Sequence, residues 1–210
     1  MAETEKRVIV LLGPTASGKT SLSILIAKAL KTEIISADSM QIYRGMDIGT
    51  AKPTKEQLTQ VPHHMIDIVE PSERFSVGQY IRAVVPIIER LHSEGKIPLV
   101  VGGTGLYIRA MTKGLFEVPQ PPQGLREKLK EIAKEDPQSL FTELQKLDPE
   151  KAEELNPTDL RRIIRALEVI FTTGRAMSDL QKNLTRRFPY EFIKIGITRD
   201  RKELYKLIEP

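Results

Sequence analysis

One loop near the amino terminus constrains the fold more than any other stretch of this chain. Residues 13–20 read Gly-Pro-Thr-Ala-Ser-Gly-Lys-Thr, which matches the phosphate-binding pattern G-x-x-x-x-G-K-[ST]. The apolar run at 8–12 indicates a buried strand, and apolar residues recur at helical spacing after the loop. This order predicts an α/β fold, a P-loop NTPase-like parallel sheet core flanked by helices. The residues expected to face the sheet from the helix are Leu22, Leu25, Ile26, Ala29 and Leu30.

This phosphate-binding loop (the P-loop, residues 13–20) suits an anion. Consecutive backbone N–H groups point into it, and the amino terminus of the helix adds partial positive charge. Lys19 supplies a full positive charge, and the hydroxyl of Thr20 is placed to hold Mg²⁺. The residues expected to bind phosphate are Gly13, Pro14, Thr15, Ala16, Ser17, Gly18, Lys19 and Thr20. The motif predicts a bound phosphate group and leaves open which compound carries it.

The composition excludes several kinds of site. The 210 residues include no cysteine, which rules out disulfides, thiolate zinc sites and cysteine nucleophiles. Three histidines leave little room for a histidine-based metal site. No apolar run is long enough for a signal peptide or a membrane span, so we expect a cytoplasmic protein with no membrane partner.

Two further strand ends carry polar candidates. A short strand is predicted at 33–36 and leads to Asp38, the best carboxylate candidate for chemistry, although a local capping role would also explain it. The strand predicted at 99–101 leads to Gly-Gly-Thr-Gly, where Thr104 offers a hydroxyl or a simple helix cap. Many P-loop NTPases place an aspartate at such a strand end to hold magnesium. The glycine found here favours a P-loop adapted to other chemistry over a standard ATPase.

The stretch between these strands is irregular. Residues 40–53 have no clean helical or strand period and predict a long ordered loop, which in compact domains is usually functional. His63 and His64 follow; adjacent side chains point in different directions, so they rarely chelate one metal. A structural role is favoured for this pair over a role in lining a substrate site.

The chain divides into three predicted parts. Residues 1–116 form the first part of the P-loop core, 117–188 an all-helical insert, and 189–210 a return to the core. The insert contains a helix expected to begin at Asn156-Pro157 and to end at Gly174, with three arginines on one side. Since the pattern breaks off at Pro210, we expect a carboxy-terminal part beyond it.

Charge is distributed unevenly around the net charge of +4. Residues 117–159 carry 6 basic and 11 acidic side chains, a balance of −5, and residues 160–210 carry 12 basic and 6 acidic, a balance of +6. Such a basic stretch could meet nucleic acid, although ordinary solvated helix faces are the simpler explanation of the charge alone.

Several segments together resemble one family, the tRNA dimethylallyltransferases, also called tRNA isopentenyltransferases. The matching stretches are the P-loop and residues 35–53, 63–67, 101–107 and 162–169. The P-loop is shared with many enzymes that bind ATP or other nucleotides, whereas the stretches at 38–53 and 102–107 are far more specific. Members of this family usually continue well beyond the point where this sequence stops.

The resemblance implies transfer of a dimethylallyl group from dimethylallyl diphosphate to N6 of the adenine at tRNA position 37, with release of diphosphate. It places the donor's diphosphate on the P-loop, held by Lys19, by a Thr20-bound Mg²⁺ and by Arg199. It makes Asp38 the general base for N6 and Thr104 a group that positions donor and acceptor.

The resemblance also implies a tRNA partner, bound through its anticodon stem-loop by a monomeric protein. The target adenine must leave its stack to reach the P-loop, so a channel for an extruded base is expected. The residues carried over as tRNA contacts are Asp38, Ser39, Met40, Gln41, Thr104, Arg126, Arg161, Arg162, Ile163, Ile164 and Arg165.

Three alternatives remain beside this interpretation. An adenylate isopentenyltransferase would use free AMP or ATP as acceptor, and a small-molecule kinase would pair a P-loop with a nearby aspartate. The third is a nucleotide-dependent binding module without chemistry. The arginine-bearing insert argues against the first, the glycine at the strand end against the second, and the presence of Asp38 and Thr104 against the third.

Overall fold

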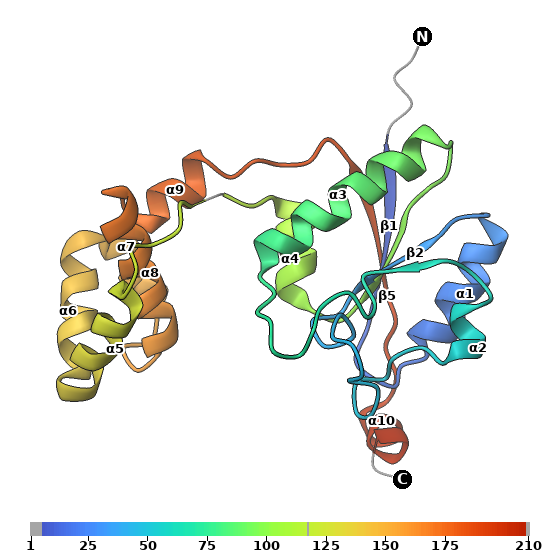
Figure 1. Cartoon of the computed structure of the whole chain (residues 1–210), viewed down its shortest axis with the longest axis horizontal. Helices are drawn as coiled ribbons and strands as arrows, with labels where there is room; N and C mark the ends of the chain where they lie inside the picture. Colours follow the sequence, from blue (N-terminus) through green and yellow to red (C-terminus); the bar gives the residue numbers. More distant parts are fainter. Residues whose placement is uncertain (1–5, 117, 209–210) are drawn as a thin grey trace. The chain divides into compact units, whose positions relative to one another are not determined.

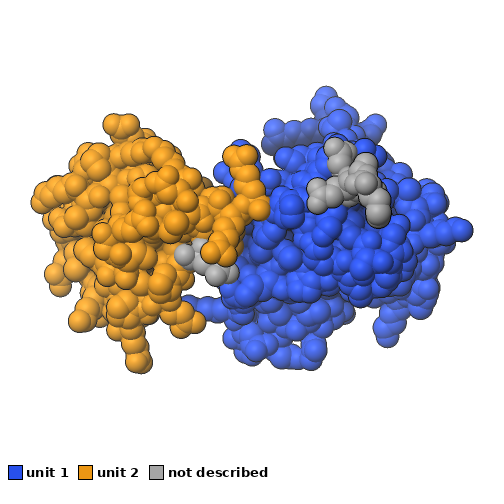
Figure 2. Space-filling view, turned by 90° about the horizontal axis from the view of Figure 1, so that it is seen from above, with its two compact units in different colours: residues 1–113, 188–210 blue, residues 114–187 orange. Residues whose placement is uncertain are grey.

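The computed structural model describes residues 6–116 and 118–208, which form two compact units (Figure 1). Unit 1 comprises residues 1–113 and 188–210, and unit 2 comprises residues 114–187 (Figure 2). The sequence-based boundary at residue 117 lies outside the described residues. No helix in the described part of the chain is both long and apolar enough to cross a membrane.

Unit 1 is a parallel sheet flanked by helices, so the predicted fold class is confirmed. The strands are β1 (Arg7–Leu12), β2 (Ile34–Ala37), β3 (His63–His64), β4 (Leu99–Gly102) and β5 (Glu191–Gly196), in the order β3-β2-β4-β1-β5. The helices are α1 (Lys19–Ala29), α2 (Lys55–Leu58), α3 (Val77–Ser93), α4 (Gly105–Lys113) and α10 (Arg201–Ile208). Helix α1 covers one face of the sheet, and α3 and α4 cover the other (Figure 1).

The carboxyl ends of four strands line up at one edge of this sheet. Leu12 of β1 pairs with Gly102 of β4 and with Gly196 of β5, and Gly102 also pairs with Ala37 of β2. Because parallel strands place their following loops on the same side, the P-loop, Asp38 and the loops after β4 and β5 gather there. The register therefore brings residues far apart in the sequence to one edge.

Gly102 is required by the close approach of two strands. A Cβ atom at this position would lie 2.3 Å from the carbonyl oxygen of Ala37, well inside van der Waals contact. The glycine that stands where other P-loop proteins carry an aspartate is therefore fixed by packing between β2 and β4. Any larger side chain would force these strands apart.

The predicted core-facing side of α1 is wrong. The side chains of Ser23, Ile24 and Ala27 are the buried ones, whereas Leu25 is 65% exposed and Leu22 is also exposed. Helix α1 carries apolar residues around most of its circumference, so more than one i, i+3, i+4 pattern fits its sequence. The orientation in which α1 leaves the P-loop decides which side of the helix packs on β1 and β4.

Unit 2 is a small helical bundle. Its helices are α5 (Leu125–Glu135), α6 (Pro137–Leu147), α7 (Pro149–Glu153), α8 (Leu160–Thr173) and α9 (Met177–Asn183). Helix α8 begins three residues later than predicted, because the Asn156 side chain accepts a hydrogen bond from the N–H of Thr158 in a local turn, and Asp159 caps the helix instead. Its end at Gly174, with φ of 69°, is as predicted.

An ion-pair cluster at the amino end of β2 makes unit 1 sensitive to acid. The hydrogen bond from Arg90 is the main cause that lowers the pKa of Glu33 from 4.5 to about 2, with burial acting against it and His64 and Lys96 adding to it. A lowered pKa stabilises the fold fully above the ordinary value, and this contribution is lost as the pH falls from 4.5 toward 2.

Replacing Glu33 by glutamine is therefore expected to lower the free energy of unfolding at pH 7 by about 1–2 kcal/mol, since Arg90 remains partly solvated. The deficit should shrink as the pH approaches 2, where the native glutamate is also protonated. Urea unfolding at pH 7 and pH 3 measures both values. Glu94→Gln, which removes a more exposed carboxylate with the same two cationic partners, is the matched control; an equal deficit for both variants would contradict the role of burial.

Candidate functional site

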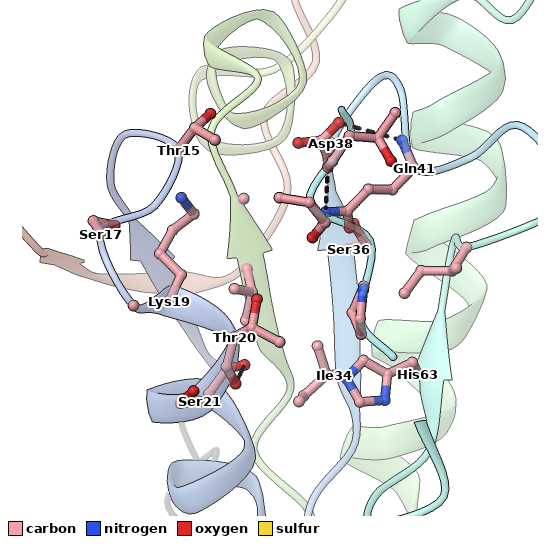
Figure 3. Close-up of a pocket in the computed structure, with 18 of the residues that line it drawn as sticks. Thr15, Ser17, Lys19, Thr20, Ser21, Ile34, Ser36, Asp38, Gln41 and His63 are labelled. Atoms are coloured by element: carbon pink, nitrogen blue, oxygen red, sulfur yellow. Dashed lines mark hydrogen bonds between the residues drawn. The ribbon is translucent and has the colours of Figure 1, made fainter. Parts of the chain in front are cut away.

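A pocket of about 250 Å³ lies at the carboxyl edge of the sheet. The P-loop and the start of α1 form one side of it, and β2 with the segments that follow β2 and precede α3 forms the other (Figure 3). Its lining residues are Thr15, Ala16, Ser17, Gly18, Lys19, Thr20, Ser21, Ser23, Ile34, Ser36, Asp38, Gln41, Thr50, Ala51, Pro53, His63, Ile66, Val101 and Gly102. All of them belong to unit 1.

The P-loop has the geometry of an anion cradle. Ala16 and Gly18 adopt left-handed backbone angles, with φ of 63° and 92°, and α1 begins directly after them at Lys19. The Lys19 ammonium bends back over the loop and donates hydrogen bonds to the carbonyl oxygens of Gly13 (2.9 Å) and Pro14 (2.6 Å). The hydroxyl of Ser17 is buried and has no hydrogen-bond partner within the described residues. An unsatisfied hydroxyl, the amino terminus of α1 and a lysine together fit a phosphate group.

The charge on Lys19 responds to its surroundings. Burial lowers the pKa of Lys19 from its ordinary value, and the negative charge of Asp38 acts in the opposite direction. The two groups therefore face a common space across the pocket (Figure 3). A phosphate bound between the two groups would lie nearer to the Lys19 ammonium than the Asp38 carboxylate does, and would therefore interact with its charge more strongly.

Asp38 presents one carboxylate oxygen to the chain and one to the pocket. Its Oδ1 accepts hydrogen bonds from the N–H groups of Met40 (2.8 Å) and Gln41 (3.3 Å). Within the described part of the chain, Oδ2 has no such partner. Asp38 can therefore cap the local turn with Oδ1 and take part in chemistry with Oδ2 at the same time.

Thr104 and Arg199 lie beside the pocket without lining it. The Thr104 hydroxyl accepts a hydrogen bond from the N–H of Ser39 at 2.9 Å, so it holds the segment that follows Asp38. The guanidinium of Arg199 lies 3.8 Å from the point that a Cβ of Gly18 would occupy. The structure therefore brings Arg199 close to Gly18 of the P-loop, although the two residues are 181 positions apart in the sequence.

His63 is a pocket residue for which the sequence favoured a structural role. Its Nδ1 is 2.8 Å from the carbonyl oxygen of Val61, which requires a proton on Nδ1 and leaves Nε2 as an acceptor. This Nε2 is buried and has no partner within the described residues. Burial is the main cause that lowers the pKa of His63, so the ring is neutral at neutral pH. His64 instead bonds to Glu33 at 2.7 Å, in keeping with a structural role.

The residues present fit a magnesium ion only if the ligand supplies most of the oxygens. The described residues contain no group of three or more histidine, aspartate or glutamate side chains able to hold a metal. The Thr20 hydroxyl lines the pocket at the start of α1, on the side where phosphate would bind. Mg²⁺ commonly takes one or two protein oxygens together with phosphate oxygens and water, so a hydroxyl at this place suffices.

Unit 2 carries the remaining candidates, and two of its arginines contact a buried acid. Arg126 forms a bidentate pair with Glu168 at 2.7 and 2.6 Å, and Arg165 lies 3.6 Å from the same carboxylate, whose side chain is 1% exposed. Arg161 and Arg162 are exposed. The burial of Ile163 and Ile164, which are 0% and 7% exposed, argues against the predicted contact of these side chains with RNA. They are core residues of α8.

Comparison with known proteins gives a consistent result. The sequence profile of a family described as IPP transferase matches residues 41–210. A tRNA dimethylallyltransferase of Thermodesulfovibrio yellowstonii is 56% identical over 98% of this chain and 65% of that protein. A second tRNA dimethylallyltransferase, from Desulfotalea psychrophila, is 44% identical over 99% of the chain and 67% of its own length. The chain thus spans about two thirds of the length of these relatives.

Solved structures of proteins with the same described activity resemble this chain. A tRNA isopentenylpyrophosphate transferase from Bacillus halodurans superimposes with a TM-score of 0.61 at 41% identity, covering 96% of this chain and 63% of the other. A eukaryotic dimethylallyltransferase acting on tRNA gives a TM-score of 0.76 at 33% identity, covering 90% of this chain and 48% of the other.

Proposed function

The chain belongs to the IPP transferase family, and we propose that it transfers a dimethylallyl group from dimethylallyl diphosphate to N6 of the adenine at position 37 of a tRNA. One observation carries this proposal: a phosphate cradle and a carboxylate oxygen of Asp38 that has no hydrogen-bond partner among the described residues share one pocket at the edge of the sheet. The cradle suits the leaving group, and the carboxylate suits the nucleophile.

The P-loop side of the pocket would hold the diphosphate of the donor. The bond between C1 of the dimethylallyl group and the bridging oxygen breaks, and its electron pair leaves with the diphosphate. Lys19 would exchange its two carbonyl partners for phosphate oxygens, and the Ser17 hydroxyl would gain the partner that it lacks. Arg199 would add a second cation from the loop after β5. These groups stabilise the charge that develops on the leaving group.

The Thr20 hydroxyl would hold a Mg²⁺ ion together with oxygens of the diphosphate. When bound, the ion supplies additional positive charge to the departing diphosphate.

The opposite side of the pocket would receive the adenine. As N6 forms its bond to C1, it must lose one proton, and Asp38 Oδ2 is the acceptor for it. Oδ1 stays fixed by the N–H groups of Met40 and Gln41, which hold the carboxylate in one orientation. Thr104, which follows β4, accepts a hydrogen bond from the N–H of Ser39 and so holds the segment next to Asp38 in place.

The exposed arginines of unit 2 would contact the phosphates of the anticodon stem-loop. Arg161 and Arg162 stand on the solvent side of α8, whose other side is buried in the core of unit 2. Such contacts position a nucleic acid without reading its sequence.

The decisive experiment supplies labelled dimethylallyl diphosphate and Mg²⁺ with either tRNA or AMP, followed by nucleoside analysis. We expect label in N6-modified adenosine from tRNA and none from AMP. Label on AMP alone would assign the adenylate as acceptor, and label on neither would overturn the proposal.

Binding of tRNA is expected to weaken steeply with salt, because each phosphate contact releases counterions. Arg161→Gln should lower the slope of log affinity against log salt concentration by about 1, measured by fluorescence anisotropy of a labelled stem-loop. Lys130→Gln removes an exposed charge from α5 and is the control that should leave the slope unchanged. A slope that is flat for the native chain would remove phosphate contacts from the proposal.

A further inference from the structure

Lys52 is a buried lysine in a segment without regular secondary structure. Its side chain is 4% exposed, whereas lysine is almost never fully buried unless it is paired. The loop around it runs from the end of β2 to α2 and supplies Gln41, Thr50, Ala51 and Pro53 to the pocket. Lys52 itself is not a lining residue, so any effect on chemistry has to pass through its neighbours.

The ammonium group of Lys52 uses all three of its donors. It donates hydrogen bonds to the carbonyl oxygen of Tyr43 (2.9 Å), to Oδ1 of Asp47 (2.7 Å) and to Oδ1 of Asp67 (2.6 Å). Burial acts to lower the pKa of Lys52, but the two carboxylates outweigh it and the pKa is raised. The group is therefore a permanent cation that ties three separated points of the chain together.

The residues next to Lys52 hold the side chain of Gln41. The carboxamide nitrogen of Gln41 donates to the carbonyl oxygens of Thr50 (3.2 Å) and Ala51 (3.0 Å), while its oxygen accepts from the Ser36 hydroxyl (3.1 Å). Ala51 is in a left-handed conformation, with φ of 49°, which an L-residue adopts only when its surroundings impose it. The positions of the Thr50 and Ala51 carbonyl groups thus depend on the hydrogen bonds of Lys52, the next residue in the chain.

Asp67, the third partner of Lys52, closes the arrangement from the other side. It also has a left-handed backbone, with φ of 54°, and its N–H donates to the carbonyl oxygen of Gln41 at 3.1 Å. The N–H of Gln41 in turn bonds to Asp38 Oδ1 (Figure 3). A continuous set of contacts therefore runs from the buried ammonium to both ends of Gln41 and on to the carboxylate.

We propose that Lys52 is a positioning residue, which fixes Gln41 and through it the orientation of Asp38 toward the acceptor base. This inference rests on the proposed function, in which Asp38 takes the proton from N6. The donor side of the pocket is built by a different segment, the P-loop, and the three hydrogen bonds of Lys52 go to Tyr43, Asp47 and Asp67 instead. Loss of Lys52 should therefore impair the acceptor side selectively.

The test compares Lys52→Met with Lys55→Met, an exposed lysine of α2 in the same region. For Lys52→Met we expect a kcat for tRNA about 10- to 100-fold lower, with the KM for dimethylallyl diphosphate changed less than twofold. For Lys55→Met both values should stay within twofold of the native chain. A merely structural role would instead lower the number of donor-binding sites per chain, counted by calorimetric titration, by the same factor as kcat, and would overturn the inference.

Asp67→Asn is a milder variant that serves if Lys52→Met does not fold. Asparagine tolerates the left-handed backbone and keeps the side-chain shape, but it removes one charge from the cluster. We expect kcat to fall about 3- to 10-fold with an unchanged donor KM. An unchanged kcat would count against the inference.

Hydrogen exchange separates this inference from the proposed function, because it needs no activity. Mass spectrometry should show faster exchange at the backbone amides of Gln41 and Asp67 in Lys52→Met than in the native chain, with the P-loop helix α1 unaffected. If the native chain transfers nothing to tRNA, the proposed function fails. If it is active and the exchange is unchanged in the variant, the role of Lys52 fails.

Discussion

Replacing Asp38 by asparagine is expected to lower the rate of transfer to tRNA by about 10²- to 10⁴-fold, the range typical of a lost general base. Asparagine retains an oxygen that can accept the N–H groups of Met40 and Gln41, so the local turn should persist. It cannot take the proton that N6 must lose. Single-turnover kinetics with labelled donor measure the rate, and calorimetric titration measures donor affinity, which should change less than about threefold.

The control for this variant is Glu56→Gln, which neutralises an exposed carboxylate in α2 of the same unit. Its rate and its donor affinity should both match the native chain. If Asp38→Asn lost donor affinity and rate by the same factor, the carboxylate would belong to the donor site. If it kept the native rate, another group would have to take the proton.

The sequence predicted the parts of the site that depend on local patterns. The P-loop needs two glycines separated by four residues, a lysine and a hydroxyl between a strand and a helix, and all of these lie within residues 13–20. Asp38 follows from the rule that parallel strands gather their carboxyl-end loops at one edge. The approach of Arg199 to the P-loop comes from the resemblance, because the position of β5 beside β1 depends on strand order.

What the sequence could not predict depends on packing partners that are distant along the chain. The sheet-facing side of α1 is decided by the strands that lie opposite the helix. The burial of Ile163 and Ile164, by contrast, follows from the apolar spacing of α8, and it is the resemblance that named them as tRNA contacts. His63 reaches the pocket because β3 pairs with β2, in a register that aligns it with Ile34. Lys52 gives no sequence signal as a buried cation, since its carboxylate partners come from an irregular loop and from the segment after β3.

Gly102, at the end of β4, was noticed in the sequence as a departure from other P-loop proteins, but its cause could not be seen there. Its presence predicted a P-loop adapted to chemistry other than that of a standard ATPase, in agreement with the family to which the chain belongs. The structure adds the physical cause, which is contact between the backbones of β2 and β4 at Ala37. Asp38, the carboxylate that lines the pocket, lies one residue beyond that contact, just after the end of β2.

Replacing Lys19 by methionine is expected to weaken the affinity for dimethylallyl diphosphate by about 10- to 100-fold and to lower the rate of transfer further. The loss in affinity reflects one charge-assisted contact to a phosphate oxygen, and the loss in rate reflects the charge that grows on the leaving diphosphate. Methionine fills a similar volume, so the stem of the side chain still packs. Calorimetry with donor alone and single-turnover kinetics at saturating donor separate the two effects.

The pH dependence of donor binding provides a second test of the same residue. Because burial lowers the pKa of Lys19 in the free protein, its charge is lost at a lower pH than that of an ordinary lysine. Donor affinity of the native chain should therefore decline on the alkaline side before exposed lysines titrate, and Lys19→Met should lack this decline. Lys28→Met, which removes an exposed lysine at the far end of the same helix, should behave as the native chain does. An alkaline decline that survives in Lys19→Met would mean that another cation holds the diphosphate, and Arg199 would not explain it, since arginine stays charged throughout this range.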